Sequence, residues 1–399
     1  VGQRLNVGHV LEGSVRKSGD RVRVTAQLIK VSDGFHLWSD KYDKRLDDIF
    51  TIQDEISRTI VETLKLKLTG KTDPVASVGA VPIEAYQLYS QGRYNLNLRT
   101  AAGFKSALGC FEQAIKNFPE YALAHTGLAD TYFLLFAYDL MEPREAIARA
   151  RHYVHQAIEL NPRQSEAHNT LGGILAYYDW AWEEAEAAFK KSLEYGPGYA
   201  TAHQWYGEIM AYQKRTDEAE GRLLRAHEMD PLSAIILTML GCVYLIKNQP
   251  AEALKTFKQA YEIGTDNDAT YAGYGFSLLS LGRTDESLEV FDEGCRRSKN
   301  GSYSITMRAH GHAMISKTEE TKKAIEELEK RREREYVPEA YLATLYLDIG
   351  DEKKGISWLE KAIRRHNTEL IFMAAMPYYA NVRRIERAHT LLSVVGLPQ

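Results

Sequence analysis

The sequence has few cysteines, no long apolar run and no excess of charge of one sign. Its three cysteines, Cys110, Cys242 and Cys295, lie far apart and form no CxxC pair, which argues against a disulfide framework or a zinc site. No run of eighteen apolar residues occurs, so we expect no membrane span. The net charge is only −4, without the basic excess that is typical of nucleic-acid binders, so we expect no nucleic-acid partner.

The usual catalytic motifs are also missing from the sequence. It contains no GxxxxGK[ST], no GxGxxG after a predicted strand, no HExxH and no GxSxG. His152 and His155 stand three residues apart on a predicted helix, but no nearby cysteine or carboxylate completes a metal-ligand set. We therefore expect no catalytic residue, no cofactor and no metal in this chain, and predict that it is not an enzyme.

What the sequence does contain is an internal repeat. Gly207, Gly241 and Gly275 are evenly spaced, and the same step reaches two further small residues, Ala309 and Ala343. A period of about 34 residues is typical of stacked helix pairs. A small residue on one helix lets the next helix approach closely, and a large side chain on that second helix fills the remaining groove. The large residue follows each of these anchors after sixteen positions, as Leu223, Phe257, Phe291, Ile325 and Leu359.

These residues resemble the tetratricopeptide repeat family, whose helix pairs stack into a right-handed superhelix. The strongest matches are TMLGCVYLIKNQPAEALKTFKQAYEIG and TAHQWYGEIMAYQKRTDEAEGRLLRAHEMDP. Upstream the spacing stretches, and we expect nine extra residues in the inter-helix loop of the second repeat, around Asp139 to Arg144. The prediction is a mainly α-helical solenoid of about eight helix pairs over residues 83–368. Residues 369–399 should cap it, with one helix from Asn381 to Val395.

Residues 1–70 lack the repeat and are predicted to form a small antiparallel sheet and a helix. Between two turn signals, four apolar residues alternate with polar ones, as in a strand with one buried face. They are Val22, Val24, Ala26 and Leu28. A helix is expected to begin at Asp47 and to run to about Leu68. Residues 71–82, rich in glycine, proline and small side chains, read as a linker.

The string VLEGSVRKSGDRVRVTAQLIKVSDGFHLWSDKYDKRLDDIFTIQDEI resembles the latter half of the TolB-N-terminal-like (FlgO-like) domain. The resemblance implies a bacterial multidomain regulator in which tetratricopeptide repeats follow this domain. The module before it in such proteins is a nucleotide cyclase, a protein kinase or a winged-helix DNA-binding domain. The opening strand and helix of that family have no counterpart before Val1, so we expect the sequence to be part of a longer protein.

The resemblance to tetratricopeptide repeats also implies a concave groove, lined by the first helix of each pair, that binds a protein or peptide. The alternative is that this groove packs against the chain itself or in a homodimer. The Lys, Asn and Arg clamp that the family uses for acidic C-terminal tails is absent apart from Arg93 and Asn169. The predicted groove residues are Tyr86, Tyr89, Arg93, Thr126, Asp130, Phe133, Glu166, Asn169, Thr201, Gln204, Glu208 and Phe276.

The leading interpretation is a protein-interaction or scaffold module, the sensing arm of a bacterial regulatory protein in the cytoplasm. Two alternatives stay open. The chain is the C-terminal part of a larger signalling enzyme or of a winged-helix transcriptional regulator, with the activity upstream. Or it is an envelope-associated assembly protein, which would place the repeats in the periplasm.

Overall fold

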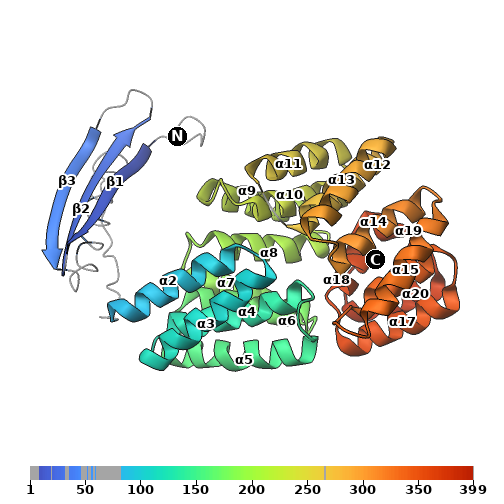
Figure 1. The fold of residues 1–399 in the computed structure, drawn as a ribbon, viewed down its shortest axis with the longest axis horizontal. Coiled ribbons are helices and arrows are strands. Elements are labelled where there is room, and N and C mark those ends of the chain that lie inside the picture. Colours follow the sequence, from blue (N-terminus) through green and yellow to red (C-terminus); the bar gives the residue numbers. More distant parts are fainter. Residues whose placement is uncertain are drawn as a thin grey trace. The chain divides into compact units, whose positions relative to one another are not determined.

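The computed structural model describes residues 9–18, 20–31, 36–45, 52, 55–56, 59, 82–264 and 267–398 (Figure 1). The chain forms two compact units, Val1–Gln87 and Leu88–Gln399. Of the helix expected from Asp47 to Leu68, only Ile52, Glu55, Ile56 and Thr59 are described, and all four are helical. The rest of that helix and nearly all of the predicted linker lie outside the described residues.

The N-terminal unit contains a three-stranded antiparallel sheet in the order β1-β2-β3. The strands are β1 (His9–Ser18), β2 (Arg21–Lys30) and β3 (His36–Arg45). The alternation predicted for β2 is confirmed, because Val22, Ala26 and Leu28 are buried while Arg21 and Arg23 are exposed. On the buried face, Val22 packs with Tyr42 of β3 and with Ile52.

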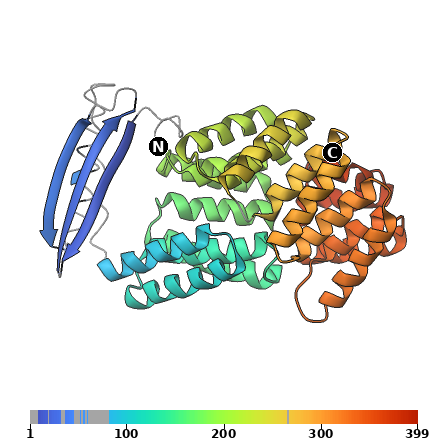
Figure 2. The ribbon, with the colours of Figure 1, turned by 45° about the horizontal axis from the view of Figure 1, so that its top comes forward.

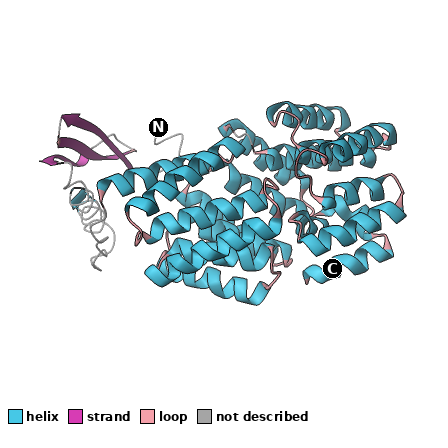
Figure 3. Cartoon of the chain, turned by 60° about the horizontal axis from the view of Figure 1, so that its bottom comes forward, coloured by secondary structure: helices cyan, strands magenta, loops and turns pink. Residues whose placement is uncertain are grey.

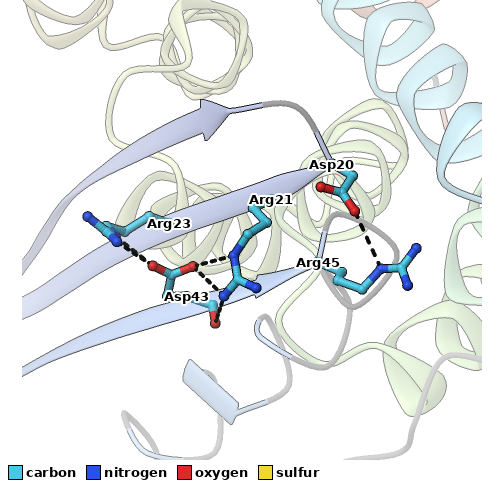
Figure 4. Close-up of polar contacts among 5 residues, drawn as sticks. All are labelled: Asp20, Arg21, Arg23, Asp43 and Arg45. Atoms are coloured by element: carbon cyan, nitrogen blue, oxygen red, sulfur yellow. Dashed lines mark hydrogen bonds and ion pairs between the residues drawn. The ribbon is translucent and has the colours of Figure 1, made fainter.

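The opposite face of β2 and β3 carries ion pairs (Figure 4). Arg21 and Arg23 both reach the Asp43 carboxylate, at 2.9 and 2.5 Å, because Arg23 and Asp43 are register partners. Their hydrogen bonds lower the pKa of Asp43. A weaker pair joins Arg45 to Asp20 at 3.8 Å. Exposed pairs of this kind contribute little to stability, so the register is held mainly by the backbone ladder and the buried face.

The helical unit contains eight helix pairs within the described residues, as predicted. The helices stack side by side along the unit (Figures 2 and 3). The first helices of the pairs are α2 (Ile83–Asn97), α4 (Ala122–Ala137), α6 (Ser165–Tyr177), α8 (Ala200–Tyr212), α10 (Ala234–Ile246), α12 (Asp268–Ser280), α14 (Ser302–Met314) and α16 (Glu339–Asp348). The second helices are α3 (Ala101–Asn117), α5 (Pro143–Leu160), α7 (Trp182–Tyr195), α9 (Thr216–Met229), α11 (Pro250–Ile263), α13 (Thr284–Arg297), α15 (Thr318–Arg331) and α17 (Glu352–Arg365).

The small anchors of the repeat allow the two helices of a pair to touch. A methyl group added to Gly275 on α12 would lie 2.5 Å from the ring of Phe291 on α13. At Gly241 on α10 the distance to the ring of Phe257 on α11 would be 2.8 Å. Real carbon contacts are longer than this, so the first helix needs glycine where the aromatic ring of the second helix meets it.

A second signal with the same period lies in the turn between the paired helices. One residue of each turn adopts a left-handed backbone, at evenly spaced positions through five successive repeats. They are Lys214, Asn248, Gly282, Ser316 and Gly350, with φ from 56° to 80°. Only two of the five are glycine, so this signal is hidden from a search for glycine.

The second repeat differs from the prediction, because its nine extra residues do not form a long loop. They mostly lengthen the helices: α4 has 16 residues and α5 has 18, whereas α10 and α11 have 13 and 14. Residues 138–142 are left as a turn of five.

The C-terminal segment, residues 367–398, does not contain the single helix predicted from Asn381 to Val395, because Ile385 interrupts it. It consists of α18 (Glu369–Ala375), η2 (Pro377–Tyr379), α19 (Ala380–Arg383), α20 (Glu386–Leu392) and η3 (Ser393–Val395). Met376 is extended, as a residue before proline prefers, and Ile385 is extended again, so no continuous helix can form. The segment contacts the last pair through α17 and α16, and through α18 it also contacts α8.

We predict that Gly275→Ala lowers the free energy of unfolding by about 1–3 kcal/mol, because the new methyl group overpacks the contact with Phe291. The matched control is Gly221→Ala on α9, where an added methyl group meets no atom within 4 Å. There the substitution should stabilise by about 0.5–1 kcal/mol. Urea denaturation followed by circular dichroism measures both, and equal midpoints for the two variants would contradict the packing argument.

Candidate functional site

The first helices of the pairs carry all twelve predicted groove residues. Eleven lie on α2, α4, α6 and α8, and Phe276 lies on α12. The structure brings most of them into two clusters. We call the polar one the front cluster; it contains Tyr89, Arg93, Asp130, Glu166 and Thr201. Tyr86 is half-buried on the first turn of α2.

The front cluster is organised by an ion pair across the first three repeats. Arg93 Nη1 of α2 lies 2.6 Å from Asp130 Oδ2 of α4. The hydroxyl of Thr170 on α6 donates to the same carboxylate. Asp130 is buried, whereas about a quarter of the Arg93 side chain is exposed. The pair therefore ties three helices together and still presents its cation to solvent.

Further groups surround this pair. Burial raises the pKa of the Asp130 carboxyl, and Arg93 offsets part of the effect. Burial also raises the pKa of Glu166, which lies within electrostatic range of Arg93 and Asp130. Tyr199, just before α8, interacts with the same charges and its hydroxyl bonds to Thr201. The sequence pattern missed Tyr199 because it lies eight positions before the Gly207 anchor, outside the expected contact positions.

Beside the front cluster lies an amide without hydrogen bonds. Asn169 of α6 is fully buried, and neither its Nδ2 nor its Oδ1 has a partner among the described residues. Gln164 donates to Thr126 at 2.6 Å, but its own carbonyl oxygen is unsatisfied there too. Each unsatisfied buried polar group costs about 1–3 kcal/mol of folding free energy. This part of the inner face therefore contains polar atoms that would gain from a hydrogen-bond partner.

The second cluster is aromatic and surrounds a buried acid. Phe133 of α4 lies 5.0 Å from Trp205 of α8, centroid to centroid. Glu208 accepts hydrogen bonds from Tyr177 at 2.6 Å and from Gln204 at 2.8 Å. Burial raises the pKa of Glu208, and these two donors offset part of the effect. These side chains form the core of the inner face rather than an open groove.

From this core the inner face continues into the chain's own C-terminal segment. The Phe372 ring of α18 meets Tyr212 of α8 at 5.7 Å. Farther along, Tyr378 stacks on the predicted groove residue Phe276 at 4.1 Å. In the later repeats, residues 372–378 therefore cover the first helices, which is the intramolecular packing named above as an alternative to ligand binding.

A buried charged pair fixes that covering segment. His310 of α14 donates from Nδ1 to Asp348 at 2.6 Å and from Nε2 to the Tyr378 carbonyl at 3.0 Å. Burial opposes the charged form of His310, but Asp348 outweighs it and the pKa is raised. The Tyr379 hydroxyl donates to Glu369 at 2.5 Å.

The array also closes on itself along a seam between its early and late repeats. Tyr341 of α16 donates to Asp139 in the α4–α5 turn at 2.6 Å. His366, after α17, donates to the Tyr178 carbonyl at 2.8 Å. Trp182 of α7 donates to the Val395 carbonyl at 2.7 Å. The partners in each contact are far apart in sequence, so no local sequence pattern predicts these contacts.

The described residues contain neither a cluster of metal ligands nor an activated thiol at Cys242. No group of three or more His, Cys, Asp or Glu among them could hold a metal ion, and His152 and His155 gain no such partner. Burial raises the pKa of Cys242 to about 12, so this thiol is a poor nucleophile. In the part of the chain that the structure describes, no helix combines the length and apolar character of a membrane span.

Comparison with known families identifies the repeats. A family model described as tetratricopeptide repeat matches residues 96–140, 181–234 and 211–269. Together with the eight helix pairs, these matches show that the chain contains tetratricopeptide repeats, a fold that implies protein partners.

Two known proteins are similar in sequence to parts of this chain. A protein of Rhizobium meliloti (strain 1021) named "Putative adenylate cyclase 3" is 34% identical over 180 residues, which are 44% of this chain and 30% of that protein. Anaphase-promoting complex subunit 3 of Schizosaccharomyces pombe is 29% identical over 111 residues, 27% of this chain and 15% of that protein. The chain thus spans less than a third of the length of either relative.

A solved structure titled "Human IFIT1 dimer with m7Gppp-AAAA" is similar in fold, with a TM-score of 0.51. It is 15% identical, and the match covers 78% of each chain. At this level of identity the likeness concerns the fold alone.

We predict that the stability of the closed array falls as pH rises, because the Asp139 carboxyl lies in the seam, where its Oδ1 is buried without a hydrogen-bond partner among the described residues. Burial raises its pKa to about 8, against about 3.9 in an unfolded chain. Between these values the unfolded state loses the proton and the folded state keeps it, so stability falls with rising pH and levels off above pH 8. Asp139→Asn keeps an acceptor for Tyr341 and should remove the share of this fall that Asp139 causes, about 1–3 kcal/mol between pH 5.5 and 8.5, while Glu369, whose pKa burial raises to about 7, keeps its own share.

Thermal melts at the two pH values test this, with the exposed Asp285→Asn as the control. An Asp139→Asn variant whose melting temperature falls as steeply as that of the wild type would contradict the assignment. The variant should be the more stable protein at pH 8.5 and nearly equal to the wild type near pH 4.

Proposed function

We propose that this chain is a protein-interaction scaffold that binds an extended protein segment at the front cluster. The observation that carries the proposal is the convergence of polar side chains from four repeats on one inner face. Tyr89, Arg93, Glu166 and Thr201 are each half-buried, so they have a fixed position and an accessible surface. Binding sites combine these two properties.

The chemistry of the front cluster suits a polypeptide backbone flanked by side chains of either charge. Arg93 and Glu166 offer one cation and one acid within electrostatic range of each other. Asn169 adds a buried donor and acceptor that are not hydrogen-bonded among the described residues. Peptides pair with such groups through alternating N–H and C=O groups.

The C-terminal segment supports the proposal from the other end of the array. Residues 372–378 already lie on the inner face of the later repeats, held by ring contacts with Tyr212 and Phe276. The inner face of this solenoid is therefore chemically able to hold a polypeptide. We propose that a partner uses the front cluster, which this segment leaves open.

We infer further that the chain is the sensing arm of a larger bacterial regulatory protein and works in the cytoplasm. The resemblance of residues 1–70 to the TolB-N-terminal-like domain and the partial similarity to the cyclase-named Rhizobium protein support this inference. In that arrangement a catalytic or DNA-binding domain belongs to another part of the parent protein. Adenylate cyclase assays on this chain alone should then show no turnover. A homodimer stays a prediction.

We predict that Asn169→Leu stabilises the free protein and weakens its binding of a peptide ligand. Replacing an unsatisfied buried amide by an apolar group of similar size removes a cost of about 1–3 kcal/mol. A peptide selected from a displayed library on the wild-type chain would lose about tenfold or more in affinity, measured by fluorescence anisotropy, because hydrogen bonds to the amide are lost.

Two controls make the outcome specific. Glu166→Gln keeps the size of a half-buried side chain and should weaken binding without a large change in melting temperature. Arg225→Ala on the outer helix α9 changes an exposed side chain and should leave the affinity unchanged. If Asn169→Leu and Glu166→Gln both bind the selected peptide as the wild type does, the front cluster is not the binding site.

A further inference from the structure

We propose that a second site, a basic pocket at the seam, binds a polyphosphate group. The pocket has a volume of about 560 Å³, within the range of small-molecule sites. Its lining residues come from the start of α5 and from the segment between α15 and the end of α17, and none of them belongs to the front cluster. Five cationic side chains line it: Arg144, Arg332, Lys361, Arg364 and Arg365.

The two carboxylates that line this pocket, Glu339 and Glu142, already have interaction partners within the chain. Glu339 is buried and lies 3.0 Å from Arg332 and 3.5 Å from Arg365. Glu142 caps α5 by accepting from the backbone N–H of Glu145 at 3.1 Å. Two carboxylates against five cations leave three positive charges in excess. The chain as a whole has a net charge of −4, so the pocket is a positively charged region on a negatively charged protein.

Three of the cations have no acidic partner. Within the described residues, Arg144, Lys361 and Arg364 form no ion pair with a carboxylate. Arg332 is engaged through Nη2, but its Nη1 is buried without a hydrogen-bond partner in that part of the chain. Among the residues that the structure describes, the pocket therefore offers three unpaired cations and one preformed donor to an anion.

An aromatic ring holds two of the cations in place. Lys361 Nζ lies 3.8 Å from the centroid of the Trp358 ring, and the Arg332 guanidinium lies 4.4 Å from it. Cation–π contacts fix the position of a charge without neutralising it. Trp358 thus pre-organises the pocket while leaving its positive charge available.

The excess charge selects the class of ligand. An anion with a single charge would balance only one of these three cations, whereas a di- or triphosphate carries about three to four negative charges. Its several oxygens also match the forked N–H groups of arginine. The shared chemistry is the phosphate chain, whether free or attached to a nucleoside.

Position at the seam gives such a ligand a structural effect. Arg144 from the second repeat donates to the backbone carbonyl of Arg364 in the eighth at 3.4 Å, and both residues line the pocket. Like charges facing each other across a contact oppose its closure. An anion between them attracts both cationic side chains and so offsets their repulsion. Binding of the anion should therefore favour the closed array.

Isothermal titration of the chain with sodium tripolyphosphate tests the site. We expect one binding event per chain with a dissociation constant in the range of about 10–100 μM and a steep loss at high salt. The double variant Lys361→Gln/Arg364→Gln should bind at least tenfold more weakly. The matched control is Lys258→Gln on α11, an exposed lysine far along the sequence, which should leave the affinity unchanged.

Parallel titrations identify the source of the phosphate chain, and hydrogen exchange tests the coupling to the seam. ATP that binds as well as or better than tripolyphosphate, and is lost in the double variant, supports a nucleotide as the source. ATP that binds where tripolyphosphate does not would overturn recognition of the phosphate chain. Equal affinity in the double variant, or none in the wild type at 1 mM, would overturn the site. Bound tripolyphosphate should slow amide exchange in residues 138–142, and unchanged exchange would overturn the coupling.

Discussion

The contact between a glycine on one helix and a ring on the next is the constraint on which the rest of this structure depends. Where Phe291 meets Gly275 and Phe257 meets Gly241, the backbones of paired helices approach as closely as side-chain volume permits. In the other regular repeats a glycine or alanine faces a leucine or isoleucine instead of a ring, and this similar approach gives each pair a similar orientation to its neighbour. Small rotations then add up along the solenoid. After eight pairs the last helices reach the second and third repeats, and the seam from Tyr341 to Asp139 closes.

Closure divides the inner face into a part that is filled and a part that is open. On the later repeats, residues 372–378 cover apolar and aromatic side chains that a solenoid with an open axis would leave to solvent or to a ligand. This arrangement requires carboxyl groups to be buried, and burial raises the pKa of Glu369 to about 7 and that of Asp139 to about 8. In the early repeats Tyr89, Arg93, Glu166 and Thr201 of the front cluster are half-buried, so the chain combines a self-filled core with a separate polar region.

Local periodicity explains which features the sequence predicts and which it does not. The eight pairs and the glycine and ring positions follow from the long period, and the alternation in β2 follows from a period of two, both of which sequence displays directly. The seam is different, because Trp182 and Val395 share no period and meet only when the curvature of all intervening repeats is summed. Spacing also cannot tell a longer loop from longer helices, which is why the insertion near Asp139 was assigned to a loop. The same spacing puts the predicted groove residues on the first helices of the pairs, but it does not tell how deeply each side chain is buried.

Helix α4 connects the two regions that the structure singles out. Asp130 in its middle holds the front cluster through Arg93, and Phe136 near its end, about 9 Å along the axis, accepts a hydrogen bond from Thr368 of the C-terminal segment. A packed helix moves as a unit, so a ligand that shifts α4 against α16 changes both the front cluster and the seam. Binding free energies at two sites linked in this way are reciprocal. A partner at the front cluster and an anion at the seam would then either assist or oppose each other by the same factor, and the sign depends on whether the partner prefers the closed array.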